Sequence, residues 1–279
     1  MTKSWSTCLL SGLIVTALLA AALPAEAQYK PIRPKKAVTP TAQGEKFVLE
    51  VNGNFWYPTP VFVASADGLG VKGSTIDASA DLGIAKKWIW DVRAVLKLGA
   101  HHKLLGSYLP LQYSSVATLK ADITFNGVTY PLNAQVASNL SWKTYRVGYE
   151  YDYVTGPEGF LGLILQVKIS KANIALSSIV GDQVAAAQAP IPAIGTIGRF
   201  YISKGVSLTG ELSYFKLPSS WIPDATGHHT EYDIYLRYNP INNAGIQIGY
   251  RKIDIGVEVK DVNGQVKMGG FYAGAMFRF

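Results

Sequence analysis

One histidine lies on the same strand face as two carboxylates, which is the arrangement in this sequence closest to acid–base chemistry. His229 precedes Glu231 and Asp233 at spacings of two and four, so all three share one face of an extended segment. A histidine next to a carboxylate can act as a general base. Ser207 and Ser213 share a face of the preceding segment, but the sequence holds no Gly-x-Ser-x-Gly nucleophile motif. A catalytic role for His229 therefore stays an alternative interpretation.

The histidines come in two adjacent pairs, His101-His102 and His228-His229. A metal site needs ligands that converge, whereas adjacent strand residues point to opposite faces, so neither pair can chelate a metal alone. We expect no metal site, no cofactor and no catalytic residue, and hence a protein that is not an enzyme.

Charged residues recur at alternate positions of otherwise apolar segments. Side chains at i, i+2 and i+4 of a strand share a face, so these charges would line one surface of a sheet. Charges of both signs there could pair and close a channel, or leave a narrow path without clear ion preference. The residues that we expect to face such a lumen are Glu50, Asp91, Arg93, Lys97, Arg146, Glu150, Lys168, Arg199, Glu211, Glu231, Asp233 and Arg237.

The opposite parity is apolar and aromatic on nearly every segment. In the first, Phe47, Leu49, Val51, Phe55 and Tyr57 share one face. The pattern predicts ten strands at about 45–57, 87–98, 103–115, 138–153, 159–177, 191–203, 205–217, 229–239, 244–259 and 265–279.

Three details of this pattern are irregular. The parity of the third strand is ambiguous, and Pro110 predicts an interruption there. In the ninth strand the apolar parity changes after Tyr250, which indicates a bulge near Lys252 or emergence from the membrane.

The connections between these strands alternate in length. Short ones are expected at 99–102, 154–158, near 204 and at 240–243, and longer ones at about 58–86, 116–137, 178–190 and 218–228, with a tight tip at 261–264. Membrane barrels have short periplasmic turns and longer extracellular loops. Residues 65–85 could hold a short surface helix, and Asn126-Gly127 predicts the turn of a β-hairpin over 123–130.

The composition is unlike that of an ordinary soluble domain. The chain is 48% hydrophobic and 16% charged, against about 25% charged in soluble proteins. After residue 27 no apolar run reaches the ~18 residues of a transmembrane helix. A closed barrel is then the remaining structure that can span a membrane. The only cysteine, Cys8, precedes the expected cleavage site, so no disulfide is expected.

The N-terminus predicts export. Lys3, the apolar run 9–23 and Ala25-Glu26-Ala27 form a signal peptide, 1–27, with Sec-type export and cleavage near Ala27. Residues 28–44 are a basic, proline-rich periplasmic tail, and 45–279 form the barrel. The formal charge of +7 includes four cations in the tail, for which we expect solvation and not nucleic-acid binding.

The last strand places Phe271, Phe277 and Phe279 on one face and ends at the C-terminus. This pattern resembles the terminal strand of small Gram-negative outer-membrane β-barrel proteins, without matching a subfamily. The resemblance implies outer-membrane localisation, recognition of these three residues by the barrel-assembly machinery, and contact with outer-membrane lipid and lipopolysaccharide.

A water-soluble secreted barrel or sandwich is the competing fold. It would place its apolar face inward, but the apolar parity here carries more large residues than a narrow barrel can pack. The sequence thus favours an all-β, closed antiparallel transmembrane barrel of about ten strands, within eight to twelve.

We interpret this chain as a non-enzymatic structural or interaction barrel with a narrow, charge-lined lumen. A small porin or channel is the first alternative, and an outer-membrane rim protease or lipid hydrolase the second. The sequence does not indicate an oligomeric state.

Overall fold

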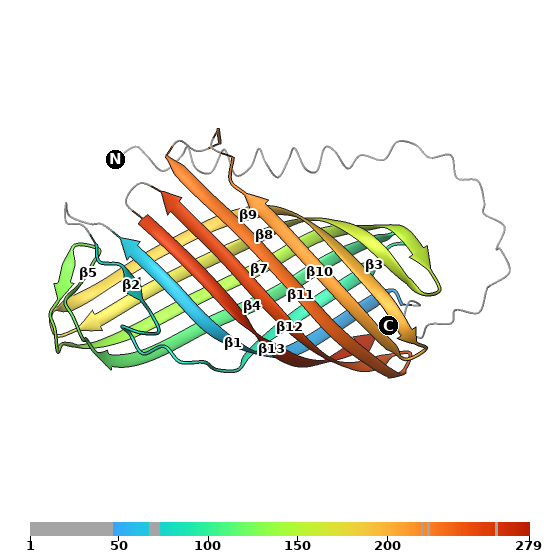
Figure 1. Cartoon of the computed structure of the whole chain (residues 1–279), viewed down its shortest axis with the longest axis horizontal. Coiled ribbons are helices and arrows are strands. Elements are labelled where there is room, and N and C mark those ends of the chain that lie inside the picture. The colour runs from blue at the N-terminus through green and yellow to red at the C-terminus, as the bar shows by residue number, and fades with distance from the viewer. Residues whose placement is uncertain (1–46, 67–72, 219, 222–223, 260–261) are drawn as a thin grey trace. The chain divides into compact units, whose positions relative to one another are not determined.

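A closed antiparallel β-barrel makes up most of the computed structural model (Figure 1). The structure describes residues 47–66, 73–218, 220–221, 224–259 and 262–279. The expected signal peptide, 1–27, and basic tail, 28–44, lie outside these ranges. Within them, no helix has the length and apolarity to cross a membrane.

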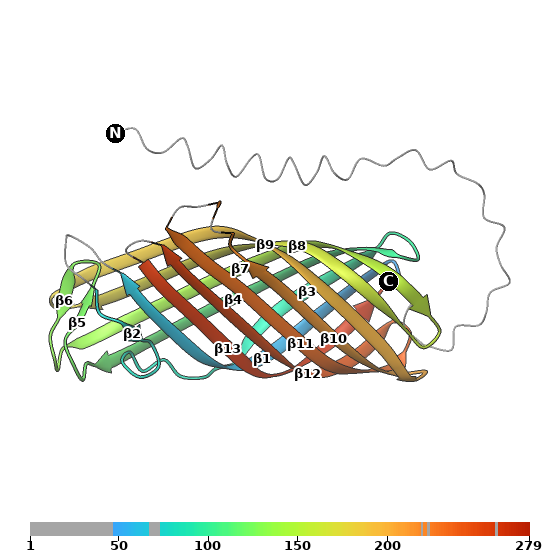
Figure 2. The same cartoon turned by 45° about the horizontal axis from the view of Figure 1, so that its top comes forward.

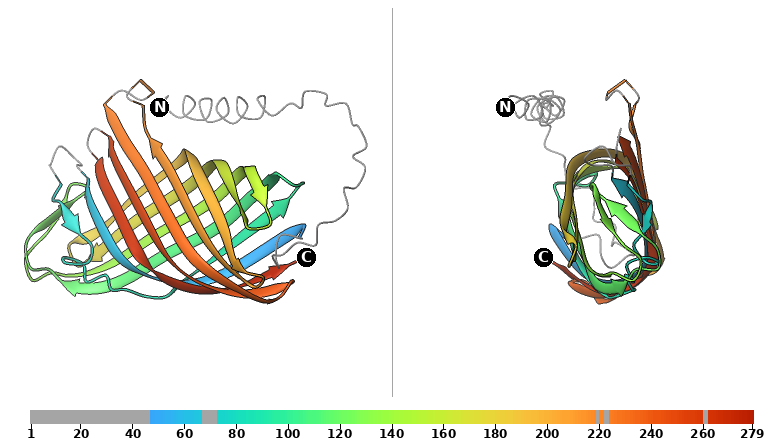
Figure 3. Two further views of the ribbon diagram at one scale, coloured as in Figure 1. Left: turned by 45° about the vertical axis from the view of Figure 1, so that its right-hand side comes forward. Right: turned by 90° about the vertical axis from the view of Figure 1, so that its left-hand side faces the viewer.

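Ten strands of the described residues form the barrel wall, each hydrogen-bonded to the next. Their bounds are β1 (Leu49–Ala66), β3 (Ile89–Lys97), β4 (His102–Thr118), β7 (Gln135–Gly156), β8 (Gly159–Ser178), β9 (Gly181–Ser203), β10 (Val206–Lys216), β11 (Ala225–Ile241), β12 (Ala244–Val259) and β13 (Val262–Arg278). The wall closes where β13 pairs with β1, with Glu50 opposite Arg278. Seen end-on, the strands form a ring (Figure 3). The expected fold class and strand number are confirmed.

The period-two pattern places apolar side chains outside and polar ones inside. On β8, Leu163 and Leu165 are 49% and 54% exposed, whereas Ile164 between them is 0% exposed and Gln166 is 5% exposed. In the third expected strand, now β4, the odd residues face inward, beginning with Lys103. An apolar outer face is stable in contact with lipid. In a soluble protein the same face would have to be buried.

The expected short turns are confirmed, but one expected loop is wrong. Residues 178–190 are not a long connection, because β8 and β9 continue to a two-residue turn at 179–180. The alanine-rich part of β9 lacks the large apolar residues that make alternation visible in a sequence. Pairing with β8 holds it extended instead.

The irregularity expected near Lys252 is also absent from the pairing. The described register of β12 with β13 continues through Lys252 without a shift. Ile253 therefore faces inward, where it is 7% exposed. The sequence pattern changes there because the interior of the barrel becomes apolar, and no bulge is needed.

The extracellular half of the interior is filled by apolar side chains. Residues 73–88, which include β2 (Ile76–Asp77), form no helix, so the surface helix expected within 65–85 is wrong for its described part. The side chains of this segment pack instead against the inner faces of β1 and β4. The buried cluster includes Phe62, Ile76, Leu82, Ile84, Leu111, Tyr113, Trp142 and Met268.

The β-hairpin that the sequence predicts over 123–130 is confirmed, and its buried side chains belong to this apolar cluster. Its strands are β5 (Ile123–Phe125) and β6 (Val128–Tyr130), joined at Asn126 and Gly127 with φ of 49° and 83° (Figure 2). Positive φ at both positions is the type I′ geometry that asparagine and glycine tolerate. Phe125 and Tyr130 are 1% and 0% exposed, so the hairpin covers this end of the barrel interior.

The wall between β1 and β4 is incomplete in its extracellular half. β3 begins only at Ile89 and pairs with β1 no further than Trp56. Residues 73–88 bridge the two edges beyond that point. Ser79 Oγ donates to the carbonyl of Pro60 at 3.0 Å, and Ser115 Oγ donates to the carbonyl of Gly83 at 3.1 Å.

Three prolines face this incomplete stretch of wall. Leu49 exchanges backbone hydrogen bonds with Phe279, so the odd-numbered residues of β1 direct their N–H and C=O groups toward β13. The even-numbered residues, which include Pro58 and Pro60, direct theirs toward the gap. The same alternation on β4 aims the nitrogen of Pro110 there. Proline has no backbone N–H, so a proline at these positions leaves no hydrogen-bond donor unpaired where the neighbouring strand is missing. Both β1 and β4 run through their prolines, and the interruption expected at Pro110 is wrong.

Candidate functional site

The lumen is the candidate site, because the structure gathers the charged residues there. All twelve of the residues expected to line it lie on the inner side of the wall. Eight are buried, namely Glu50, Asp91, Arg146, Glu150, Lys168, Arg199, Asp233 and Arg237, and Arg93, Lys97, Glu211 and Glu231 are partly exposed.

Glu50 of β1 forms the first charge cluster, at the periplasmic end. Arg237 Nη1 lies 3.0 and 2.9 Å from its two carboxylate oxygens, and Arg278 Nε lies 2.7 Å from Oε2. Arg237 also donates to Asn52 Oδ1 and Gln247 Oε1. Every partner here is 3% exposed or less, and charge-assisted hydrogen bonds of this kind are stronger than neutral ones.

Phe47 lies beside this cluster and not on the lipid-facing side where its parity places it. Its ring is 4.9 Å from the Arg278 guanidinium carbon and 5.4 Å from Lys97 Nζ. Phe47 precedes β1, so the strand parity does not extend to it.

The second charge cluster joins two acids and two arginines in the middle of the barrel. Arg93 Nη2 is 2.6 Å from Asp233 Oδ2, and Arg251 Nη1 is 3.1 Å from Asp91 Oδ1. Longer contacts of 3.4 Å complete the square, from Arg93 to Asp91 and from Arg251 to Asp233. Tyr272 donates to Asp233 Oδ1 at 2.9 Å.

Arg251 is held by aromatic rings as well as by acids. Its guanidinium carbon is 5.3 Å from the Trp56 ring and 5.1 Å from the Tyr272 ring. Such contacts stabilise a desolvated cation, in addition to its ion pairs.

A third cluster lies near the periplasmic turns, around Lys103. Its Nζ is 2.7 Å from Glu150 and 2.8 Å from Asp152, and it lies 3.5 Å from the centroid of the Phe160 ring.

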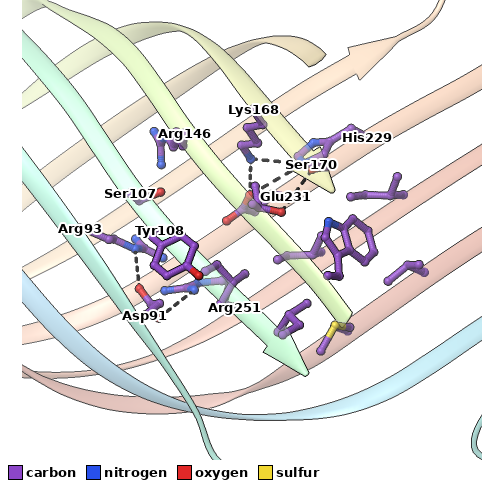
Figure 4. A pocket seen from close by; sticks show the side chains of 18 residues that line it. Asp91, Arg93, Ser107, Tyr108, Arg146, Lys168, Ser170, His229, Glu231 and Arg251 are labelled. Carbon is purple, nitrogen blue, oxygen red and sulfur yellow. Dashed lines mark hydrogen bonds and ion pairs between the residues drawn. The ribbon is translucent and has the colours of Figure 1, made fainter. Parts of the chain in front are cut away.

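The fourth cluster contains the histidine that could do chemistry, and Figure 4 shows its residues Arg146, Lys168, His229 and Glu231. Lys168 forms an ion pair with Glu231 and lies 3.2 Å from His229 Nε2 and 3.4 Å from Ser213 Oγ. His229 Nε2 is 3.9 Å from the Glu231 carboxylate. Arg146 Nη2 lies 2.7 Å from Glu211 Oε1 on the same side of the barrel.

This arrangement does not present His229 as an open catalytic base. The residue is 2% exposed and lies next to a lysine ammonium group. Asp233, its second expected partner, is engaged by Arg93 and Tyr272. His228, on the opposite face of β11, is 3.4 Å from Asp254 on the outer surface. No group of three metal-ligating side chains occurs among the described residues.

The ion pairs cross the lumen between strands that are not neighbours in the wall. Glu50–Arg237 joins β1 to β11, Arg93–Asp233 joins β3 to β11, and Asp91–Arg251 joins β3 to β12. Arg146–Glu211 joins β7 to β10, and Lys168–Glu231 joins β8 to β11. Two internal cavities beside them hold about 40 and 60 Å³. At about 10–15 Å³ per water, each has room for only a few water molecules.

Comparison with known proteins gives a match in structure alone. No family model and no curated protein sequence matches the chain. The outer membrane protease OmpT from Escherichia coli has a TM-score of 0.53 and 11% identity, over 83% of this chain and 96% of OmpT. The chain has the fold of an outer-membrane β-barrel. At this identity the likeness shows the fold and not an activity.

Other outer-membrane barrels give weaker matches. Ail, the attachment invasion locus protein of Yersinia pestis, has a TM-score of 0.36 and 14% identity, over 83% of this chain and 99% of Ail. The Pseudomonas putida toluene transporter TodX has a TM-score of 0.34 and 8% identity, over 83% of this chain and 90% of TodX.

The outer surface of the barrel has the belt that membrane barrels require. Alternate residues of β7 are 36–68% exposed, namely Tyr145, Val147, Tyr149, Tyr151 and Tyr153. Phe271, Phe277 and Phe279 of the last strand point outward and are 73%, 54% and 71% exposed. A large exposed apolar surface around the whole wall needs hydrocarbon contact.

Sequence reasoning missed two residues that organise the lumen of this barrel. Arg251 follows the expected change of parity in its strand, and Lys103 belongs to the strand of ambiguous parity, so the period-two pattern assigned neither residue to the lumen. The expected lumen set, limited to charged residues, also leaves out Asn52, Asn54 and Gln247. They carry no charge, but Gln247 Nε2 donates to Asn54 Oδ1 at 2.7 Å, and Asn54 Nδ2 donates to Asp91 at 3.0 Å. A strict period of two through Lys252 would have found Arg251.

Proposed function

We propose that this protein is a non-enzymatic outer-membrane barrel with a closed lumen, which acts as a structural or interaction protein. The observation that carries the proposal is the set of five ion pairs that join non-neighbouring strands across the lumen. Breaking a buried pair leaves an uncompensated charge and costs several kcal/mol, so these contacts resist transient opening.

The apolar cluster supports the same proposal. It lies between the charge clusters and the extracellular end, and Leu82, Leu111 and Tyr113 are 2–3% exposed within it. An ion would therefore have to pass the apolar side chains as well as the ion pairs. A narrow pore, the alternative, would need both barriers to move.

An interaction role would use the extracellular end. Beside the barrel rim lies an open depression of about 360 Å³, which β1 and β11–β13 line. Its polar lining residues are Ser65, Thr75, Thr226, His228, Glu258, Asn263 and Gln265. This volume falls in the range of small-ligand sites, whereas the lumen cavities do not.

Conductance in planar bilayers tests the closed lumen. The mature protein should give no steady conductance. The double variant Arg251→Ala with Asp91→Ala keeps the net charge, and so does Arg237→Ala with Glu50→Ala. Each double variant removes one ion pair and leaves the apolar cluster in place, so it should give at most brief openings. Adding Leu82→Ser and Ile84→Ser should lengthen those openings. Steady conductance of the unaltered protein would support the pore alternative.

A second assay tests the absence of catalysis. The folded protein should hydrolyse neither a mixed peptide library nor phospholipid esters faster than the heat-unfolded protein does. Turnover that His229→Asn abolishes, while Phe215→Ala preserves it, would instead support the rim-enzyme alternative.

A further inference from the structure

Two lysines face each other on the lipid-facing side of the wall. In the pairing of β7 with β8, Lys143 lies directly opposite Lys171, and Tyr145 lies opposite Ile169 one step closer to the periplasm. Tyr145 and Ile169 are exposed outward, as are both lysines. The apolar runs of both strands therefore end at the same level, and the lysine pair follows at the extracellular boundary of the belt.

Side chains directly opposite in an antiparallel ladder have Cβ atoms about 4.5–5.5 Å apart, and like charges there destabilise the pair. Two other outward-facing cations, on β11 and β13, lie near one acid. Lys267 of β13 is 3.9 Å from Asp254, and His228 is 3.4 Å from the same carboxylate. The arrangement of two lysines side by side thus differs from that of these two cations, which share one acid.

The surroundings of the lysine pair lack negative charge. The outward-facing residues of β4, β7 and β8, all within the described part, include no aspartate or glutamate, because Glu150 and Asp152 point inward. Polar side chains continue above the lysines. Ser141 lies opposite Asn173 on the next outward-facing pair, and Gln188 of β9 lies opposite Lys171.

We propose that Lys143 and Lys171 together bind a phosphate of a phosphorylated, sugar-containing lipid headgroup in the outer leaflet. Two ammonium groups on adjacent strands can donate to one phosphate from both sides, which removes their mutual repulsion. Ser141, Asn173 and Gln188 offer hydrogen bonds to sugar hydroxyls above it. The acyl chains of the lipid would lie along Tyr145 and Ile169. The proposal does not depend on whether the lumen conducts.

Binding of lipid A to the folded protein in detergent, measured by native mass spectrometry, tests this site. The comparison uses bis-phosphorylated lipid A and chemically dephosphorylated lipid A. Lys143→Gln with Lys171→Gln should weaken binding of the phosphorylated lipid at least fivefold and leave binding of the dephosphorylated lipid unchanged. Raising the salt concentration should weaken binding to the unaltered protein, because the contact is between charges at the surface.

The matched control is Lys252→Gln with Lys267→Gln, which removes two outward charges from β12 and β13 and should leave lipid A binding unchanged. Heat-modifiable migration shows that each variant is folded. Equal losses in both double variants would show a general charge effect and overturn the site. Unaltered binding by the Lys143/Lys171 variant would overturn it too. Displacement of lipid A by an equal concentration of inorganic phosphate would show that the lysines recognise free phosphate and not a lipid.

Discussion

Glu50 of β1 and Arg237 of β11 form an ion pair across the lumen, with Arg237 Nη1 2.9 and 3.0 Å from the two carboxylate oxygens. The two residues are 187 positions apart in the chain, and their strands are not neighbours in the wall. Both side chains are 2–3% exposed. The contact therefore exists only in the closed barrel, and its loss reports on the lumen without altering the lipid-facing surface.

We predict that Glu50→Gln destabilises the barrel more than Glu211→Gln does. Glu50 accepts from both Arg237 and Arg278, whereas Glu211 pairs with Arg146. Losing Glu50 leaves two buried cations without their acid, and a broken buried pair costs about 3–5 kcal/mol. The measurement is urea unfolding in phospholipid vesicles, followed by tryptophan fluorescence. Equal stability of the two variants would contradict the two-cation cluster.

Leu165→Arg should lower the stability of the barrel by roughly 2–4 kcal/mol, because the side chain is 54% exposed toward the hydrocarbon near the middle of β8. The control is Gln166→Arg, which places an arginine at the next position, where the side chain faces the lumen. The folded yield in vesicles should fall for the first change in a way that depends on bilayer thickness, and no such dependence should appear for the second. Tolerance of Leu165→Arg together with better solubility without lipid would indicate a soluble barrel.

Phe279 should have two separable roles. Its backbone N–H donates to Leu49 O at 2.8 Å, and its carbonyl accepts from Val48 and Leu49, so the residue helps to close the wall. Deleting Phe279 should slow refolding in vesicles, whereas Phe279→Ala keeps these backbone bonds and should refold normally.

In cells the two Phe279 variants give a sharper comparison. If the assembly machinery recognises the aromatic side chain, the Phe279→Ala protein should be exported to the periplasm but should not assemble into the outer membrane. Outer-membrane levels equal to those of the unaltered protein would exclude that recognition.

The folded protein should migrate differently in detergent gels before and after boiling. The ring of ten described strands is closed, because β13 is paired with β1 over seventeen residues, and a closed ring resists unfolding by detergent. Identical migration with and without boiling would contradict closure of the wall. Extending the same assay to Leu82→Asp should show a lower conversion temperature, since Leu82 is 3% exposed in the apolar cluster.

The sequence alone determined which side of most strands faces lipid and where most strands and turns lie. This was possible because both signals are local. A strand has a side-chain period of two, so a run such as Leu161, Leu163 and Leu165 against Gly162 and Gln166 assigns both faces without knowledge of any partner. The Asn126-Gly127 turn is local in the same way, because those two residue types tolerate positive φ.

Only the tertiary structure decided which lumen charges meet and what closes the barrel. Barrel closure sets the register that brings Arg93 next to Asp233 and Arg251 next to Asp91, at separations of 140 and 160 residues. The segment 73–88 reads as a surface loop, yet its apolar side chains fill the interior, because β3 is too short to complete the wall between β1 and β4. The period of two gives the face of each residue, but the contacts between strands depend on register and closure, which no local pattern encodes.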